Sequence, residues 1–173
     1  MGMICIIAEK PSVAAELARI VGAGKRETGY IEGNGYIVTW AIGHLVTLAM
    51  PQQYGIDGFR KEDLPLVPKP FKLVVRQIKK DGEYVNDPAA VRQLSVIRHC
   101  FNRSEKIIVA TDAGREGELI FRYIHSYLNC DSACGSAALR TKPSGTGSGN
   151  SGPEMSLTAC MRQAGPVARP TGL

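Results

Sequence analysis

Two continuous apolar runs, over residues 3–8 and 107–110, dominate the hydrophobic pattern of the chain. Both are rich in β-branched residues and contain no charge, which is typical of parallel strands that are buried on both faces. Each run ends abruptly in polar residues. Apolar residues then recur at helical spacing over 13–21 and over 115–128. The pattern therefore predicts two strand-to-helix corners.

The segments between the two corners predict the rest of the fold. Residues 30–32 and 36–40 read as strands about Gly33-Asn34-Gly35, which favours a hairpin. The other expected elements, in chain order, are an irregular proline-rich stretch over 50–70, a strand over 71–75, a polar stretch over 77–87 and a helix from Asp87-Pro88 to about residue 100. We therefore expect an α/β domain over residues 1–130, with a mainly parallel sheet flanked by helices.

The second corner carries an acidic cluster. Asp112 follows the predicted strand, Glu116 falls in the first helical turn and Glu118 is close by. Ligands of open α/β sheets bind beyond the carboxyl ends of the strands, and clustered carboxylates suit Mg²⁺. The same stretch could instead be a capped helix, with Asp112 or Thr111 as N-cap and the glutamates at the positive end of the dipole. Both interpretations are open on this stretch alone.

The first corner is Glu9-Lys10-Pro11-Ser12, and its proline suits the first position of a helix. If the two apolar runs form adjacent parallel strands, Glu9 and Lys10 lie beside Asp112 and Glu116. A carboxylate and an ammonium group would then face the acidic cluster.

Three motifs follow one another at suitable spacing: Glu9-Lys10-Pro11-Ser12, Trp40-Ala41-Ile42-Gly43-His44-Leu45 and Thr111-Asp112-Ala113-Gly114-Arg115-Glu116-Gly117-Glu118. Over about residues 3–130 the chain resembles the Toprim domain of bacterial type IA DNA topoisomerases, and topoisomerase III most closely. The resemblance implies Mg²⁺-dependent breakage and rejoining of one DNA strand. It also implies single-stranded DNA segments as partner and no nucleotide cofactor.

The resemblance also assigns roles to residues. Glu9 would be a general acid and base at the 3′ hydroxyl, and Lys10 would steady the scissile phosphate. The implied metal ligands are Glu9, Asp112 and Glu116, and the implied DNA contacts are Lys10, Ser12, His44 and Arg115. Two alternatives stay open, namely a structural role for His44 and an ion pair between Arg115 and Glu118. Gly114 stands where the family commonly has a second Asp, so the resemblance implies that the metal site has one ligand fewer unless Glu9, Glu116 or Glu118 replaces it.

A basic stripe is a further candidate contact for phosphate. Its members are Lys69, Lys72, Arg76, Lys79 and Lys80. A solvated edge explains these residues as well as a phosphate-facing surface does. The net charge of +5 permits a polyanionic partner without requiring one.

The cysteines and the hydropathy of the chain indicate the cellular compartment of the protein. The five cysteines are an odd number without metal-site spacing, which favours reduced thiols in an intracellular protein. There is no signal peptide and no apolar run long enough to span a membrane. We expect a cytoplasmic protein.

The composition changes at residue 131. Residues 131–173 are rich in Gly, Ser and Pro and contain no aromatic residue, so we expect them to be unstructured. When residues 154–172 are back-translated and read in another frame, permitted codons give a peptide ending in Arg-Ser-Glu-Ala-Asp-Trp, which resembles topoisomerase sequence beyond the Toprim domain. We therefore expect a frameshift near residues 130–140 and a truncated chain. A native flexible linker is the alternative.

The chain also lacks the family's nucleophilic tyrosine, because none of its tyrosines lies in the corresponding motif. We expect that the chain alone does not relax supercoiled DNA. Two other classes remain open: a Toprim nuclease or primase-like enzyme, against which Gly43-His44-Leu45 argues, and a non-catalytic nucleic-acid-binding remnant.

Overall fold

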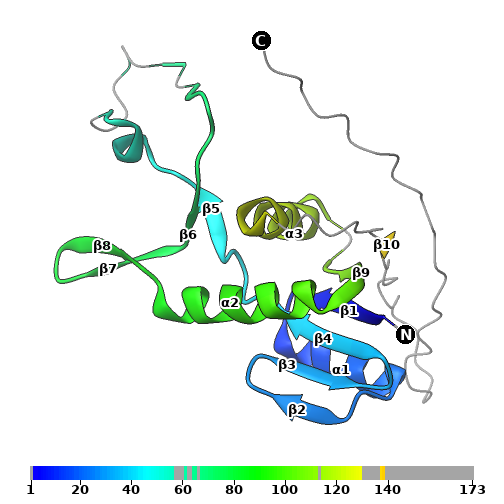
Figure 1. Cartoon of the computed structure of the whole chain (residues 1–173). Coiled ribbons are helices and arrows are strands. Elements are labelled where there is room, and N and C mark those ends of the chain that lie inside the picture. Colours follow the sequence, from blue (N-terminus) through cyan, green and yellow to red (C-terminus); the bar gives the residue numbers. More distant parts are fainter. Residues whose placement is uncertain are drawn as a thin grey trace, which may run out of the picture.

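The computed structural model describes residues 2–56, 61, 64–65, 67–112 and 114–129, together with the backbone of 137–138. A sheet of six strands in the order β10-β9-β1-β4-β3-β2 forms its centre (Figure 1). The strands are β1 (Met3–Ala8), β2 (Lys25–Glu27), β3 (Tyr30–Gly33), β4 (Tyr36–Trp40), β9 (Ser104–Ala110) and β10 (Ala137–Ala138). The first four in the sheet order are parallel, and β3 and β2 continue the sheet in antiparallel pairing. The predicted α/β class is confirmed.

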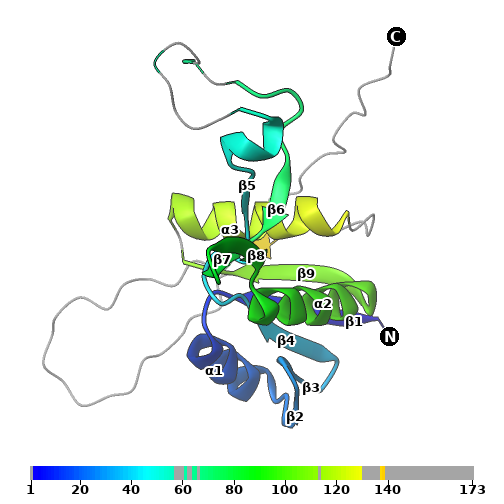
Figure 2. The same cartoon turned by 90° about the vertical axis from the view of Figure 1, so that its left-hand side faces the viewer.

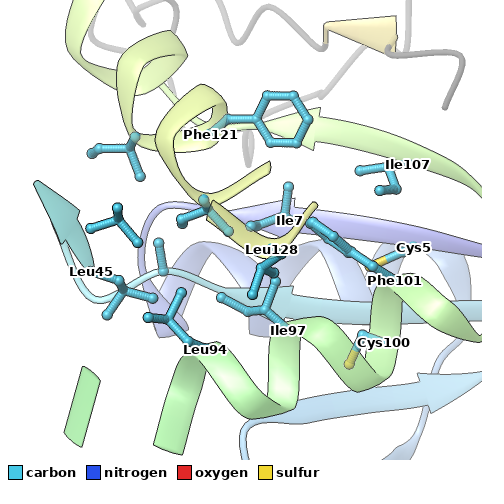
Figure 3. Close-up of a cluster of buried hydrophobic side chains, with 14 of the residues drawn as sticks. Cys5, Ile7, Leu45, Leu94, Ile97, Cys100, Phe101, Ile107, Phe121 and Leu128 are labelled. Carbon is cyan, nitrogen blue, oxygen red and sulfur yellow. The ribbon is translucent and has the colours of Figure 1, made fainter. Parts of the chain in front are cut away.

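Helices cover both faces of this sheet. Helix α1 (Pro11–Val21) packs on one face, and α2 (Pro88–Asn102) and α3 (Arg115–Leu128) pack on the other (Figure 2). Alternate residues of β1 serve the two cores: Ile6 packs on the α1 side, whereas Ile7 packs on the α2 and α3 side (Figure 3). This two-sided burial explains why β1 contains no polar residue.

Local sequence signals fix most element ends. Asp87 caps α2, because its Oδ1 accepts a hydrogen bond of 2.9 Å from the Ala89 backbone N–H. Asn34 and Gly35 both have positive φ, 50° and 81°, as the two-residue turn between β3 and β4 requires. Strand β9 begins at Ser104, earlier than the predicted residue 107. Its first residues include the exposed Glu105 and Lys106. Because these residues are charged, the apolar pattern does not indicate the start of the strand.

An arm projects from the sheet between β4 and α2 (Figure 1). It contains the antiparallel pair β5 (Val46–Leu48) and β6 (Leu73–Val75), the 3-10 helix η1 (Pro51–Tyr54), and the hairpin of β7 (Gln77–Lys80) and β8 (Glu83–Asn86). The strand predicted over 71–75 corresponds to β6, but the pattern predicted neither β5 nor the hairpin. The hairpin turns at Asp81-Gly82, where both φ values are positive.

Only residues 137 and 138 of the segment expected to be unstructured are described. They form β10, with Ala137 aligned to Ile108 of β9. Composition could not indicate this pairing, because an edge strand offers backbone groups to any neighbouring chain. The remainder of 131–173, with part of the region of the expected frameshift, lies outside the described residues.

Two further expectations can be compared with the described part of the chain. None of its helices is both long and apolar enough to cross a membrane. Cys5 and Cys100 are both buried, and burial raises the pKa of the Cys100 thiol to about 12.

Buried Gln93 ties α2 to the end of β4. Its Nε2 donates to the Trp40 carbonyl at 2.8 Å and to the Gly29 carbonyl at 3.2 Å. We predict that Gln93→Leu lowers the free energy of unfolding by about 1–3 kcal/mol, because the partly buried carbonyls of Trp40 and Gly29 lose this donor. Urea denaturation measures the change. The exposed neighbour Arg92 provides the control: Arg92→Leu should change stability by less than about 0.5 kcal/mol, and equal losses would contradict the prediction.

Candidate functional site

The candidate site lies where three parallel strands end. Ala8 of β1 is aligned with Ala110 of β9 on one side and with Trp40 of β4 on the other. Glu9 and Asp112 follow two of these ends, so both stand at the same edge of the sheet. The expectation that the two apolar runs are adjacent parallel strands is confirmed, and this edge is where open α/β sheets bind ligands.

Helix α3 packs tightly against the loop that carries Asp112. Gly117 in its first turns is buried, and a Cβ at this position would lie 2.2 Å from the Asp112 carbonyl oxygen. Only glycine allows this approach. Sequence reasoning did not single out Gly117, although a glycine inside a helical pattern often indicates a packing requirement.

The capped-helix interpretation of the acidic corner is wrong for Asp112 and Thr111. The N-cap residue of α3 is Gly114, and no side chain caps the helix. Thr111 is buried and Asp112 is exposed. Glu116 and Glu118 do lie in the first turn, where the helix dipole favours negative charge. The exposed Asp112 carboxylate is therefore left outside the cap.

Two predicted site residues from different motifs meet directly. His44 Nε2 lies 2.9 Å from Glu116 Oε1, which joins the loop after β4 to the start of α3. The imidazole of His44 and the carboxylate of Glu116 can share a hydrogen bond at this distance. The side chains of His44 and Glu116 remain 34% and 78% exposed, and both can still be reached by a ligand.

Arg76, between β6 and β7, anchors the loop that carries His44. Its Nη1 donates to the Ile42 carbonyl at 2.9 Å and to the His44 carbonyl at 3.5 Å. Its Nε donates at 3.0 Å to Asp87, the residue that caps α2. Arg76 is thus committed to protein partners, and neither a phosphate-facing stripe nor a solvated edge describes it.

The remaining predicted site residues lie at or just before the starts of α1 and α3. Lys10 and Ser12 are exposed at the start of α1, and Glu9 is half-buried before it. Arg115 is exposed at the start of α3. The proposed alternative pairing of Arg115 with Glu118 is wrong, because Glu118 Oε1 instead accepts from Arg122 Nε at 2.7 Å.

The described side chains do not enclose a metal ion by themselves. Over the described ranges, no three His, Cys, Asp or Glu side chains gather closely enough to hold one. Glu9, Asp112 and Glu116 therefore share an edge without converging. Mg²⁺ in proteins commonly takes one or two carboxylates and completes its shell with water and substrate phosphate. The exposed carboxylates of Asp112 and Glu116 fit a partial site of this kind.

Comparison with known proteins agrees with this geometry. The family model described as "Toprim domain" matches residues 4–142. The chain belongs to the Toprim domain family. This Toprim domain is 48% identical over 128 residues, 72% of the chain, to DNA topoisomerase 3 of Bacillus subtilis (strain 168). It is 46% identical over 123 residues, 69% of the chain, to DNA topoisomerase 3 of Shouchella clausii. The chain spans only 16% and 15% of the lengths of these two relatives.

The contact between Gly117 and the Asp112 loop can be tested in the Toprim domain. We predict that Gly117→Ala lowers the free energy of unfolding by about 1–3 kcal/mol, because the new Cβ displaces the Asp112 backbone. A matched control is Gly114→Ser, since a Cβ at Gly114 meets nothing within 4 Å and serine is a good N-cap. Urea denaturation should show no loss for Gly114→Ser. Full stability of Gly117→Ala would contradict the packing described.

A second test concerns the Arg76 and Asp87 pair. Hydrogen bonding from Arg76, helped by the Ala89 backbone N–H, lowers the pKa of Asp87 below its ordinary value of 3.8. The lowered pKa contributes stability above pH 3.8, and this contribution is lost as the pH falls through the folded-state value.

We therefore predict that wild type is more stable than Asp87→Asn at about pH 6, and that the difference shrinks at about pH 3. Asparagine retains the cap oxygen, so the comparison isolates the carboxylate charge. Urea denaturation at both pH values measures the difference. A difference that does not change with pH would contradict the role given to the charge.

Proposed function

We propose that this Toprim domain supplies the acid, cation and metal-binding part of a type IA DNA topoisomerase, which breaks and rejoins one DNA strand. The observation that carries the proposal is the register of β1 and β9, which puts Glu9 and Asp112 beyond neighbouring strand ends. The names of the relatives, DNA topoisomerase 3, support it. The proposed partner is single-stranded DNA, with no nucleotide cofactor.

The residues at the edge divide the chemistry between them. Half-buried Glu9 gives a proton to the 3′ oxygen that leaves on cleavage and takes it back on rejoining, as a general acid and base. Exposed Lys10 binds the scissile phosphate as a point charge. Ser12 and Arg115 contact neighbouring phosphates at the starts of α1 and α3, where helix N-termini favour anions. His44 contacts DNA beside Glu116.

Asp112 and Glu116 hold Mg²⁺, with Glu9 as a carboxylate on the neighbouring strand. When bound, the ion neutralises phosphate charge and positions the DNA ends. The buried Cys100 thiol suits a reducing compartment, which supports the cytoplasm as the proposed location.

Metal binding by the isolated chain tests this proposal. We expect Mg²⁺ to raise the melting temperature of the wild type, because it binds the folded state. Asp112→Asn should weaken Mg²⁺ at least about tenfold. Gly114→Asp should strengthen it, because the substitution adds a carboxylate at an open position. The control is Gly114→Asn, which supplies a similar cap without charge.

Thermal unfolding over a series of Mg²⁺ concentrations gives the four apparent affinities. A wild type that does not respond to Mg²⁺, or an Asp112→Asn variant that responds equally, would overturn the assignment of Asp112.

A further inference from the structure

The β7 and β8 hairpin presents two chemically different faces. Cross-strand partners are Gln77 with Asn86, Ile78 with Val85, Lys79 with Tyr84 and Lys80 with Glu83. Because successive strand residues point to opposite faces, Lys79 and Tyr84 share one face with Gln77 and Asn86. We call it the Lys79–Tyr84 face. The opposite face carries the apolar pair and the pairing of Lys80 with Glu83.

The Lys79–Tyr84 face combines a cation with a large exposed ring. Tyr84 is 70% exposed, which is more than any other large apolar side chain in the described part of the chain. Lys79 is also exposed and stands directly across from it, where Cβ atoms are about 5 Å apart. The acidic residues of the hairpin do not lie on this face: Asp81 is in the turn, and Glu83 is opposite Lys80. An anion can therefore approach Lys79 here without facing a neighbouring carboxylate.

The base of the hairpin is connected to the candidate site. Arg76, which directly precedes β7, donates to the carbonyls of Ile42 and His44, and His44 contacts Glu116. A chain of hydrogen bonds thus leads from the strand ends to the start of the hairpin. Lys79 lies two residues beyond Gln77, about 7 Å along the strand. The face therefore begins close to Arg76 along the chain.

A second cation and ring pair lies at the same base. Gln53 Nε2 donates to Gln77 Oε1 at 3.4 Å, which places η1 on the side of the Lys79–Tyr84 face. Next to Gln53, the ring of Tyr54 has Lys72 Nζ 5.4 Å from its centroid. The arm therefore holds a second pair of a lysine and a tyrosine.

We propose that the Lys79–Tyr84 face is a binding surface for single-stranded DNA outside the candidate site, with a base stacked on Tyr84 and a phosphate at Lys79. Single strands expose both groups that this face can bind, whereas a duplex keeps its bases inside the stack. The inference rests on the proposed function for its choice of DNA. It divides the basic stripe, because Lys79 contributes to binding and Lys80 does not.

Adjacent lysines on opposite faces provide a matched test of the phosphate contact. Binding of the full chain to a fluorescein-labelled oligothymidine is measured by anisotropy at several salt concentrations. We expect Lys79→Gln to raise Kd and to reduce the salt slope by about 0.7, the value for one phosphate of a single strand. Lys80→Gln removes the same charge and should change Kd less than about twofold. Equal effects of the two variants would overturn the proposal, because net charge alone would then explain binding.

Substitutions of Tyr84 test the stacking contact. Tyr84→Ala should raise Kd about fivefold or more, and Tyr84→Phe should bind like the wild type, because it keeps the ring. An unchanged Kd for Tyr84→Ala would overturn the inference.

The two proposals fail in different ways. Oligothymidine binding that is insensitive to Lys79 and Tyr84 overturns this inference and leaves the Mg²⁺ site standing. If the chain does not respond to Mg²⁺ but the substitutions of Lys79 and Tyr84 still weaken oligothymidine binding, the Mg²⁺ site is overturned and this inference stands. A chain that does not bind oligothymidine at all would overturn both the DNA partner and the face.

Discussion

The parallel pairing of β1 with β9 is the constraint on which the rest of the structure depends. β1 and the second half of β9, residues 107–110, are apolar on two sides, so they must lie inside the sheet with helices on both faces. Parallel strands end at the same edge, and the polar residues that follow them are brought together without any contact between their side chains. Glu9 and Asp112, far apart in the chain, are neighbours for this reason. The site is a consequence of how the core is buried.

A half-buried ion pair between Arg76 and Asp87 connects the arm to the elements beside the strand ends. Arg76 and Asp87 are 32% and 13% exposed at their side chains, and each also satisfies backbone groups that other elements leave open. Arg76 donates to the loop that carries His44, and Asp87 accepts from the start of α2. Loss of either partner would leave a charge and a backbone group unpaired, which costs more than the pair itself contributes. The hairpin, the loop and α2 are therefore held in one arrangement beside the strand ends.

Local signals in the sequence predicted much of this structure. Helix α3 has the predicted bounds, α1 begins at Pro11 and α2 begins directly after its capping residue Asp87, because each signal acts within one turn. The hairpin of β7 and β8 was missed although Asp81-Gly82 is a strong turn signal, because its strands are exposed and mostly polar. The roles of Gly117, Arg76 and the His44 contact could not be predicted, because each depends on a partner set by the tertiary fold. The same holds for β10, which pairs through backbone groups alone.

The central proposal is that Glu9 and Asp112, which follow neighbouring strand ends, lie at one metal site together with Glu116. Mn²⁺ tests it most directly, because it favours the same oxygen ligands as Mg²⁺ and its unpaired electrons broaden nearby amide signals in NMR spectra. Substoichiometric Mn²⁺ should broaden the signals of Glu9, Asp112 and Glu116 together. Gly22, at the far end of α1 and about 16 Å along that helix, should keep its signal. Broadening at only one strand end, or uniform broadening across the sheet, would contradict the account.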